Sequence, residues 1–236
     1  MSKKFLRQLD YLDNDRLNSY NYHIVGCGAT GSSVALHLGK LGVEDITLWD
    51  DDVINEHNYP NQMLPEILIE PTTGKEVKTL GVNKCEVLAH LLRLMSSTKA
   101  RFKTEKCLGD KEINPRSIVI LCVDDMGETG RAGIWKNIQS AALLIDTRIA
   151  LTSGNVQFVE PWDATKGRTY EGTLFSNAEM AELPCTAKST IGTPALVSAL
   201  VNAGLVHWIN GVGERATQHC FDLTDSKYII KEGMLQ

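Results

Sequence analysis

The feature that most limits how this chain can fold is a glycine-rich segment, Gly26-Cys27-Gly28-Ala29-Thr30-Gly31. A β-prone run, Tyr22-His23-Ile24-Val25, precedes the segment, and residues 30–41 follow it with the apolar spacing of a helix. In a strand–turn–helix unit the first glycine permits the tight turn, the second lets backbone N–H groups approach a phosphate, and the third lets helix and strand pack closely. The helix N-terminus adds partial positive charge. We therefore predict that a phosphate is bound by Gly26, Gly28, Ala29 and Gly31.

An acid follows at the position that nucleotide-binding folds of this kind use. Residues 45–50 are typical of a second strand, which completes a right-handed βαβ unit. Asp50 ends this strand about 20 residues after the glycines, where a carboxylate can accept hydrogen bonds from ribose hydroxyls. Together these features indicate an adenine nucleotide, either ATP or NAD. The alternative is a glycine turn that binds nothing.

The rest of the chain continues to alternate strands and helices. We expect helices over 82–96, 128–141 and 192–210, and strands over 101–107, 117–123, 142–146, within 147–162 and over 220–230. Residues 117–123 form an unbroken apolar run, which is typical of a strand buried on both faces. The prediction is an α/β fold: a Rossmann-like, mostly parallel sheet with flanking helices and a C-terminal antiparallel extension. We expect one domain over residues 1–236, with an N-terminal helical arm at 1–20, a loop-rich stretch at 51–80 and a mobile loop at 163–191.

Composition argues against several other classes of protein. Of 236 residues, 43% are hydrophobic and 22% are charged, and the net charge is -5 without a long Lys/Arg block. A broad nucleic-acid or membrane surface is therefore not expected. The chain shows no apolar window of about 20 residues and no apolar centre near its start, so we expect neither a transmembrane helix nor a signal peptide, and a cytoplasmic location. The six cysteines include no Cys-x-x-Cys pair, so no zinc site is expected.

The polar segment after the second predicted strand favours ATP over NAD. It is too polar for the second helix of an ordinary dehydrogenase. It resembles the signature of the ThiF/MoeB adenylyltransferase family, in which Asp-x-Asp-x-Val is followed by Asn-x-x-Arg-Gln. The matching residues are Asp50, Asp52, Asn58 and Gln62, whereas Asn61 stands where the family usually has arginine. The resemblance implies that Asp50 holds the ribose and that Asn58, Asn61 and Gln62 line the phosphate side, with one cation fewer than usual.

Two further motifs extend the resemblance. Lys84, at a predicted helix start, matches the lysine of the family's Gly-x-x-Lys, which contacts phosphate; the alternative is a solvated lysine near a helix end. Asp124 follows the apolar strand and matches the family's metal-binding acid, which implies Mg²⁺ held by Asp124 and phosphate oxygens. The neighbouring Asp125 can instead cap a helix. Arg131 resembles the arginine that often follows in this family, at a slightly longer spacing.

Three more features resemble family residues that serve the partner subunit, a later transfer step or the dimer interface. Arg7 matches an N-terminal arginine that reaches the other subunit's site like an arginine finger, which implies a homodimer; the alternative is a plain surface arginine. Cys185 matches a cysteine that some members use for thioester or persulfide chemistry; the alternative is an unreactive thiol. The apolar helix around 194–208 helps to form the family's dimer interface, although an ordinary core explains it equally well.

The resemblance spans roughly Phe5 to Gly211 and implies a reaction. A carboxylate attacks the α-phosphate of ATP, and an acyl-adenylate and pyrophosphate form. The family's substrate is commonly the C-terminal glycine of a ubiquitin-like or sulfur-carrier protein, and Arg7, Lys84 and Mg²⁺ would neutralise the developing charge. Two alternatives stay open: a member that acts on a tRNA base or a peptide carboxylate, and a catalytically weak nucleotide-binding partner module or NAD-dependent protein.

Overall fold

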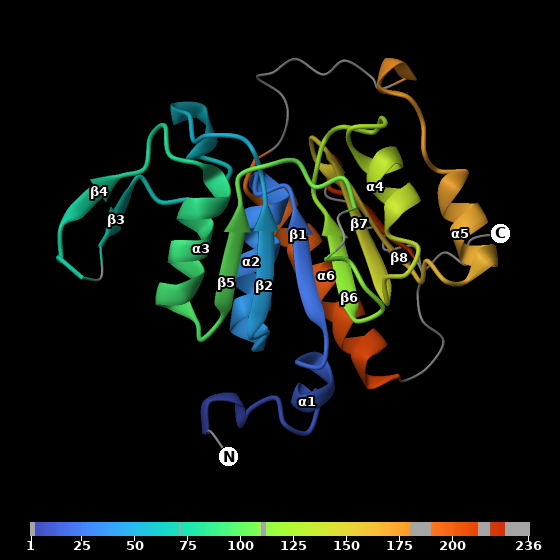
Figure 1. Ribbon diagram of the computed structural model, residues 1–236, viewed down its shortest axis with the longest axis horizontal. Coiled ribbons are helices and arrows are strands. Elements are labelled where there is room, and N and C mark those ends of the chain that lie inside the picture. Colours follow the sequence, from blue (N-terminus) through green and yellow to red (C-terminus); the bar gives the residue numbers. More distant parts are fainter. Residues whose placement is uncertain (1–2, 71, 110–111, 180–189, 212–217, 225–236) are drawn as a thin grey trace.

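A seven-stranded sheet forms the centre of the computed structural model, which describes residues 3–70, 72–109, 112–179, 190–211 and 218–224 (Figure 1). Its strands are β1 (Asn21–Val25), β2 (Asp45–Trp49), β5 (Lys99–Lys103), β6 (Ser117–Leu121), β7 (Leu143–Ala150), β8 (Ser153–Val159) and β9 (Gln218–Asp222). They lie in the order β5-β2-β1-β6-β7-β8-β9. The first five in this order pair in parallel, and β8 and β9 add antiparallel pairs. The predicted Rossmann-like sheet with a C-terminal antiparallel extension is confirmed.

The strand order reverses direction between β1 and β6. From β1 the chain moves outward to β2 and β5, and then returns to place β6 on the other side of β1. Open parallel sheets bind ligands in the crevice outside the carboxyl ends of the strands at such a switch point. The glycine turn after β1 and the Asp124-Asp125 pair after β6 both lie at this point of the sheet.

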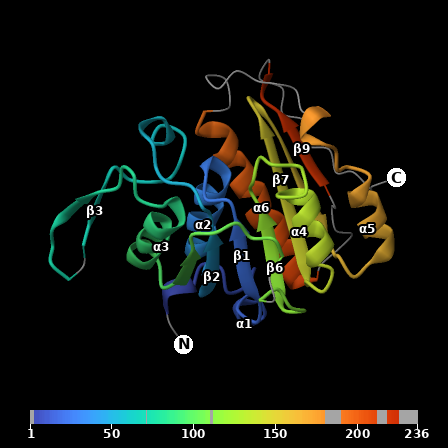
Figure 2. The same ribbon diagram turned by 45° about the horizontal axis from the view of Figure 1, so that its top comes forward.

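Helices cover both faces of the sheet (Figures 1 and 2). One face carries α2 (Ala29–Leu41), α3 (Lys84–Met95) and α6 (Gly192–Asn210), which share a core with β1 and β2 through Val34, Leu88 and Val201. The other face carries α4 (Arg131–Asn137) and α5 (Ala164–Glu171), whose Trp135 and Tyr170 rings pack 4.7 Å apart. The apolar strands are therefore buried from both sides, as the run at 117–123 indicates.

Four segments differ from the sequence-based expectations. Residues 163–179 are not a loop throughout, because they contain α5 and a 3-10 turn, η3 (Asn177–Glu179); Asp163 caps α5 by accepting from Thr165 N and Lys166 N. The stretch 51–80 contains a 3-10 turn, η2 (Glu56–Asn58), and an antiparallel hairpin of β3 (Ile67–Ile69) and β4 (Glu76–Lys78). The helix expected over 128–141 is the shorter α4. Within its described residues, 3–20, the N-terminal arm holds only η1 (Lys3–Phe5) and a single helical turn, α1 (Asn14–Leu17).

Helix α6 is long and apolar enough to cross a membrane by length and composition alone. The sequence analysis expected no such segment. The structure gives a different reason for the apolar composition, because Val197, Val201 and Leu205 are fully buried against the rest of the core. Gly204 permits the close approach of α6 to the sheet, since a Cβ there would lie 2.2 Å from the ring of Phe158. The helix thus has the packing of a core element.

Candidate functional site

The backbone of the glycine turn between β1 and α2 requires glycine at Gly26 and Gly31. Gly26 has φ +91°, and a Cβ there would lie 2.8 Å from the carbonyl oxygen of Cys122. A Cβ on Gly31 would lie 1.8 Å from the carbonyl oxygen of Gly26, so this position must be glycine for the turn to close. Gly28 is different, because nothing lies within 4 Å of a Cβ placed there. The space in front of Gly28 is open, as the approach of a phosphate requires.

Helix α2 begins at this open space without a side-chain cap. Its N-cap residue is Gly28, and no side chain accepts from the N–H groups of the first turn. Uncapped N–H groups at a helix N-terminus form a binding site for an anion. The turn therefore matches a phosphate site both in its shape and in its hydrogen-bonding capacity.

Asp50 lies directly beside the glycine turn. Its carboxylate accepts from the backbone N–H of Cys27 at 2.5 Å and from that of Asp52 at 2.8 Å. Burial raises the pKa of Asp50, and these two N–H donors together with Lys84 partly oppose the shift. The carboxylates of Asp50, Asp51 and Asp52 can place oxygens within 4.8 Å of one another, so a ribose or a cation would meet concentrated negative charge here.

Lys84 is a buried cation at this edge of the sheet. Its side chain is only 10% exposed, and its Nζ lies 2.6 Å from an Asp52 oxygen. The backbone N–H of Lys84 also donates to the Asp52 carbonyl at 3.0 Å, so helix α3 starts against the end of β2. Asn83 strengthens this junction, because it caps α3 and donates to the Asp50 carbonyl. The alternative of a freely solvated lysine is wrong, since Lys84 is buried and paired.

The loop after β2 brings Asn58, Asn61 and Gln62 to the start of α2. The N–H of Met63 donates to Ser32 Oγ at 2.9 Å, which ties this loop to the first turn of the helix. Asn58 has a structural role here, because its Oδ1 accepts from the N–H of Asn55 in a capping box. Asn61 Oδ1 and Gln62 Oε1 are buried and have no partner in the described part of the chain. A buried polar atom without a partner is costly, so these two amides fit a site completed by a ligand.

The two acids after β6 have different environments. Asp125 accepts from Gly127 N, Thr129 Oγ1 and Asn177 Nδ2, and the hydrogen bonds from Thr129 and Asn177 lower its pKa. It holds the turn before α4 rather than the helix itself, whose N-cap is Gly130. Asp124 is exposed at the switch point of the sheet. Of the two carboxylates, Asp124 is therefore the one on the surface at the site.

Arg131, which resembles an arginine of the family, is buried in an ion pair. It is 3% exposed, and its guanidinium donates to Asp146 Oδ1 at 2.8 Å and to the carbonyl of Thr147 at 2.6 Å. Asp146 also accepts from Arg148 Nε at 2.8 Å and from the Tyr170 hydroxyl at 3.1 Å. The sequence analysis missed Asp146 and Arg148. The signal that could have found them is a charged pair at the end of an otherwise apolar strand.

Arg7 is not brought to the nucleotide site within one chain. Arg7 is exposed in the arm that precedes β1, so it lies at the amino end of the strands, whereas the glycine turn lies at the carboxyl end (Figure 1). Cys185 lies outside the described residues. Cys85 and Cys122 lie near the site, but burial raises their pKa values to about 11 and about 12, so these thiols stay protonated at neutral pH.

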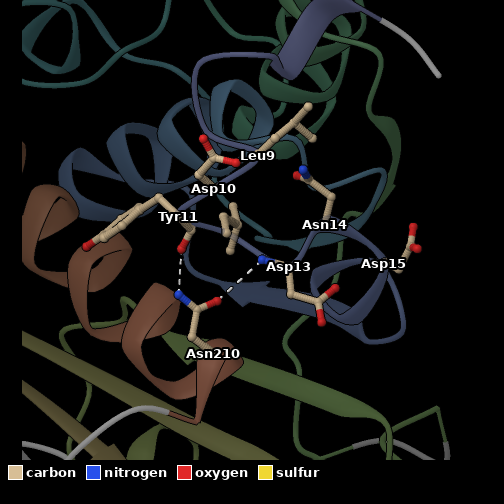
Figure 3. Close-up of a pocket in the computed structure, with 8 residues that line it drawn as sticks. Leu9, Asp10, Tyr11, Asp13, Asn14, Asp15 and Asn210 are labelled. Atoms are coloured by element: carbon tan, nitrogen blue, oxygen red, sulfur yellow. Dashed lines mark hydrogen bonds between the residues drawn. The ribbon is translucent and has the colours of Figure 1, made fainter.

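A cavity of about 540 Å³ opens far from the glycine turn, between the N-terminal arm and the end of α6 (Figure 3). Asn210 spans it by donating to the carbonyl of Tyr11 and accepting from the N–H of Asp13. The acids Asp10, Asp13 and Asp15 line the cavity and would repel phosphates. The nucleotide site is therefore assigned to the switch point of the sheet.

Comparison with known proteins identifies the family. The model of the ThiF family matches residues 3–230. This chain belongs to the ThiF family. No curated protein sequence matches the chain.

Solved structures share the fold of this ThiF-family chain at low sequence identity. E. coli MccB solved with ATP has a TM-score of 0.67 at 16% identity, over 98% of this chain and 71% of that chain. E. coli MccB solved with AMPCPP and MccA has a TM-score of 0.69 at 16% identity, over 98% and 71%. PaaA has a TM-score of 0.65 at 15% identity, over 92% and 74%. At this identity the comparison supports the architecture, and residue roles depend on the geometry described above.

Proposed function

We propose that this ThiF-family chain is an ATP-dependent adenylyltransferase that activates a carboxylate. The observation that carries the proposal is the meeting of three features at the sheet's switch point. These are an uncapped helix N-terminus behind an open glycine turn, the partly buried Asp50, and the buried Lys84 paired with Asp52. They correspond to the phosphate, ribose and charge-neutralising parts of a nucleotide site.

Each residue group has a defined part in this reaction. The N–H groups of Ala29 to Gly31 bind phosphate oxygens, and Asp50 accepts from ribose hydroxyls. Lys84 stabilises negative charge as the bond to the α-phosphorus forms and pyrophosphate leaves. Its burial strengthens this effect, because charges interact more strongly away from water. Asp124 is the proposed ligand of Mg²⁺, which would offset the charge of the leaving pyrophosphate.

The proposed substrate is the carboxyl end of a protein or peptide chain. Within that class, a ubiquitin-like or sulfur-carrier protein is the first candidate, because such proteins are commonly the substrates of the ThiF/MoeB family. A peptide substrate is supported by the shared fold of MccB, which has been solved together with MccA. We propose further that two copies form a homodimer in which Arg7 serves the partner's site, and that Cys185 serves only a later transfer step.

ATP–pyrophosphate exchange with candidate carrier proteins and peptides tests the proposal. We expect exchange that depends on one of these substrates and that Lys84→Ala lowers by about a hundredfold or more, as loss of a charge-stabilising group in an active site does. Cys185→Ala should leave the exchange rate unchanged. ATP binding without exchange for any carboxylate would instead favour the nucleotide-binding partner module. Binding of NAD but not ATP would refute the proposal.

A further inference from the structure

A buried ionic cluster beside the nucleotide site carries one positive charge in excess. It contains the guanidinium groups of Arg131 and Arg148 and a single carboxylate, Asp146. Tyr170 completes the cluster without adding charge, because burial raises the pKa of its hydroxyl. Burial alone would raise the pKa of Asp146, but the two arginines hold it below its ordinary value, so Asp146 is ionised. An unbalanced charge away from water attracts an anion strongly.

Arg148 is the member of this cluster that a ligand can reach. Its side chain is 19% exposed, compared with 4% for Arg131 and 0% for Asp146. Arg148 donates through Nε to Asp146, through Nη1 to the Thr173 carbonyl and through Nη2 to Thr173 Oγ1. A guanidinium has five N–H donors, so one N–H on each terminal nitrogen has no partner among the described residues. One of these N–H groups can donate to a carboxylate oxygen, and the positive charge of the guanidinium adds attraction for the anion.

The sheet places Arg148 next to the reacting end of the nucleotide site. Strand β6 ends at Leu121, which pairs with Asp146, whereas β7 continues to Ala150 (Figure 2). Arg148 therefore lies just beyond the carboxyl end of β6, level with the segment that leads to Asp124. The Thr147 hydroxyl fixes this arrangement by donating to the Leu121 carbonyl at 2.7 Å. The glycine turn contacts the same segment, because Gly26 packs on the carbonyl of Cys122.

We propose that Arg148 binds the C-terminal carboxylate of the substrate chain and holds it for attack on the α-phosphate. The inference rests on the proposed adenylation and names a substrate-binding residue for it. Asp146 and Thr173 hold the guanidinium through three hydrogen bonds, so its orientation is fixed before the substrate arrives. Such preorganisation lowers the entropic cost of bringing two anions together.

A competition between two peptide pools tests this role. The full chain is saturated with the ATP analogue AMPCPP and mixed with equal amounts of short peptides of random sequence, one pool with free C-termini and the other amidated. We expect the wild-type protein to retain the free-carboxylate pool over the amidated pool by at least about tenfold, the size of a hydrogen-bonded charge contact. Arg148→Gln should abolish the preference and Arg148→Lys should keep part of it. The exposed Arg168→Gln serves as the matched control and should leave the preference unchanged.

The outcomes separate this inference from the proposed function. Equal retention of the two pools by the wild-type protein, or a preference that survives in Arg148→Gln, overturns the role of Arg148 while AMPCPP binding stays normal. Failure of the wild-type protein to bind AMPCPP counts against the proposed function and, with it, this inference. Arg148→Gln should fold, because the remaining Arg131–Asp146 pair is balanced in charge, and its thermal denaturation checks this.

Discussion

At the scale of single residues, the site depends on an acid whose ionisation the fold opposes. Burial raises the pKa of Asp50, so the folded chain binds this proton more tightly than the unfolded chain does. The ionised carboxylate therefore lowers the stability of the fold above that pKa, and the loss disappears as the pH falls through it. The ionised form is the stronger acceptor for a ribose hydroxyl. The ionised Asp50 thus lowers the stability of the fold and strengthens the binding of a ribose.

The raised pKa of Asp50 lies above the ordinary range of an aspartate, and we expect ATP affinity to fall as the pH drops through it. Asp50→Asn should lower ATP affinity at neutral pH by about tenfold or more, as loss of a charged acceptor does. The variant should lose the pH step and retain at least the thermal stability of the wild-type protein. Calorimetric titration with ATP at several pH values and thermal denaturation measure these effects. If Asp50→Asn bound ATP with the affinity of the wild-type protein, Asp50 would not contribute to the nucleotide site.

The charge balance of the buried cluster gives a second prediction at this scale. Asp146→Asn leaves two guanidinium groups buried without a counter-charge, so we expect it to lower the free energy of unfolding by about 3–5 kcal/mol. Arg148→Gln leaves Asp146 paired with Arg131, so it should lower the free energy of unfolding by about 1 kcal/mol or less. Urea denaturation measures both. Equal destabilisation by the two variants would contradict the charge count.

At the scale of the elements, the sequence predicts those strands, turns and helices that neighbouring residues determine. The strand, glycine turn and helix at 22–41 follow from apolar spacing and from Gly26 and Gly31, where a side chain would clash with the backbone. The helix α5 was missed, because its stability comes from contacts distant in sequence: Tyr170 packs on Trp135 and donates to Asp146. The hairpin of β3 and β4 was not predicted, because Pro65, Pro71 and Gly74 are typical of loops. The ion pair of Arg131 with Asp146 was not predicted, because spacing alone does not show a buried partner.

The glycine turn gives a matched pair of substitutions in one element. Gly28→Ala should fold with nearly unchanged thermal stability, since nothing lies within 4 Å of the added methyl group. The methyl group occupies the open space in front of α2, so ATP affinity should fall by about tenfold or more. Gly31→Ala should destabilise the fold itself, because its Cβ would lie 1.8 Å from the Gly26 carbonyl oxygen. Thermal denaturation and ATP titration of both variants distinguish the roles. Normal ATP binding by Gly28→Ala would place the phosphates elsewhere.

At the scale of the whole molecule, the distance between Arg7 and the glycine turn decides how Arg7 can act. Strand β1 has five residues and separates the two sites by about 17 Å at the usual rise per residue. Arg7 lies further back along the chain, in the arm before this strand. An arginine cannot reach a phosphate across that span within one chain. If Arg7 acts on the nucleotide, it acts in a second copy.

Mixing two inactive variants tests this arrangement. In a dimer of Arg7→Ala and Asp124→Ala subunits, one site has an intact Asp124 and receives Arg7 from the other subunit. Random pairing makes half of the dimers mixed, and each mixed dimer has one complete site, so we expect about a quarter of the wild-type ATP–pyrophosphate exchange rate. Either variant alone should show almost none. If the mixture stays as inactive as its components, Arg7 does not act across a symmetric interface, and Lys84 is left as the side-chain cation proposed to act on the phosphates.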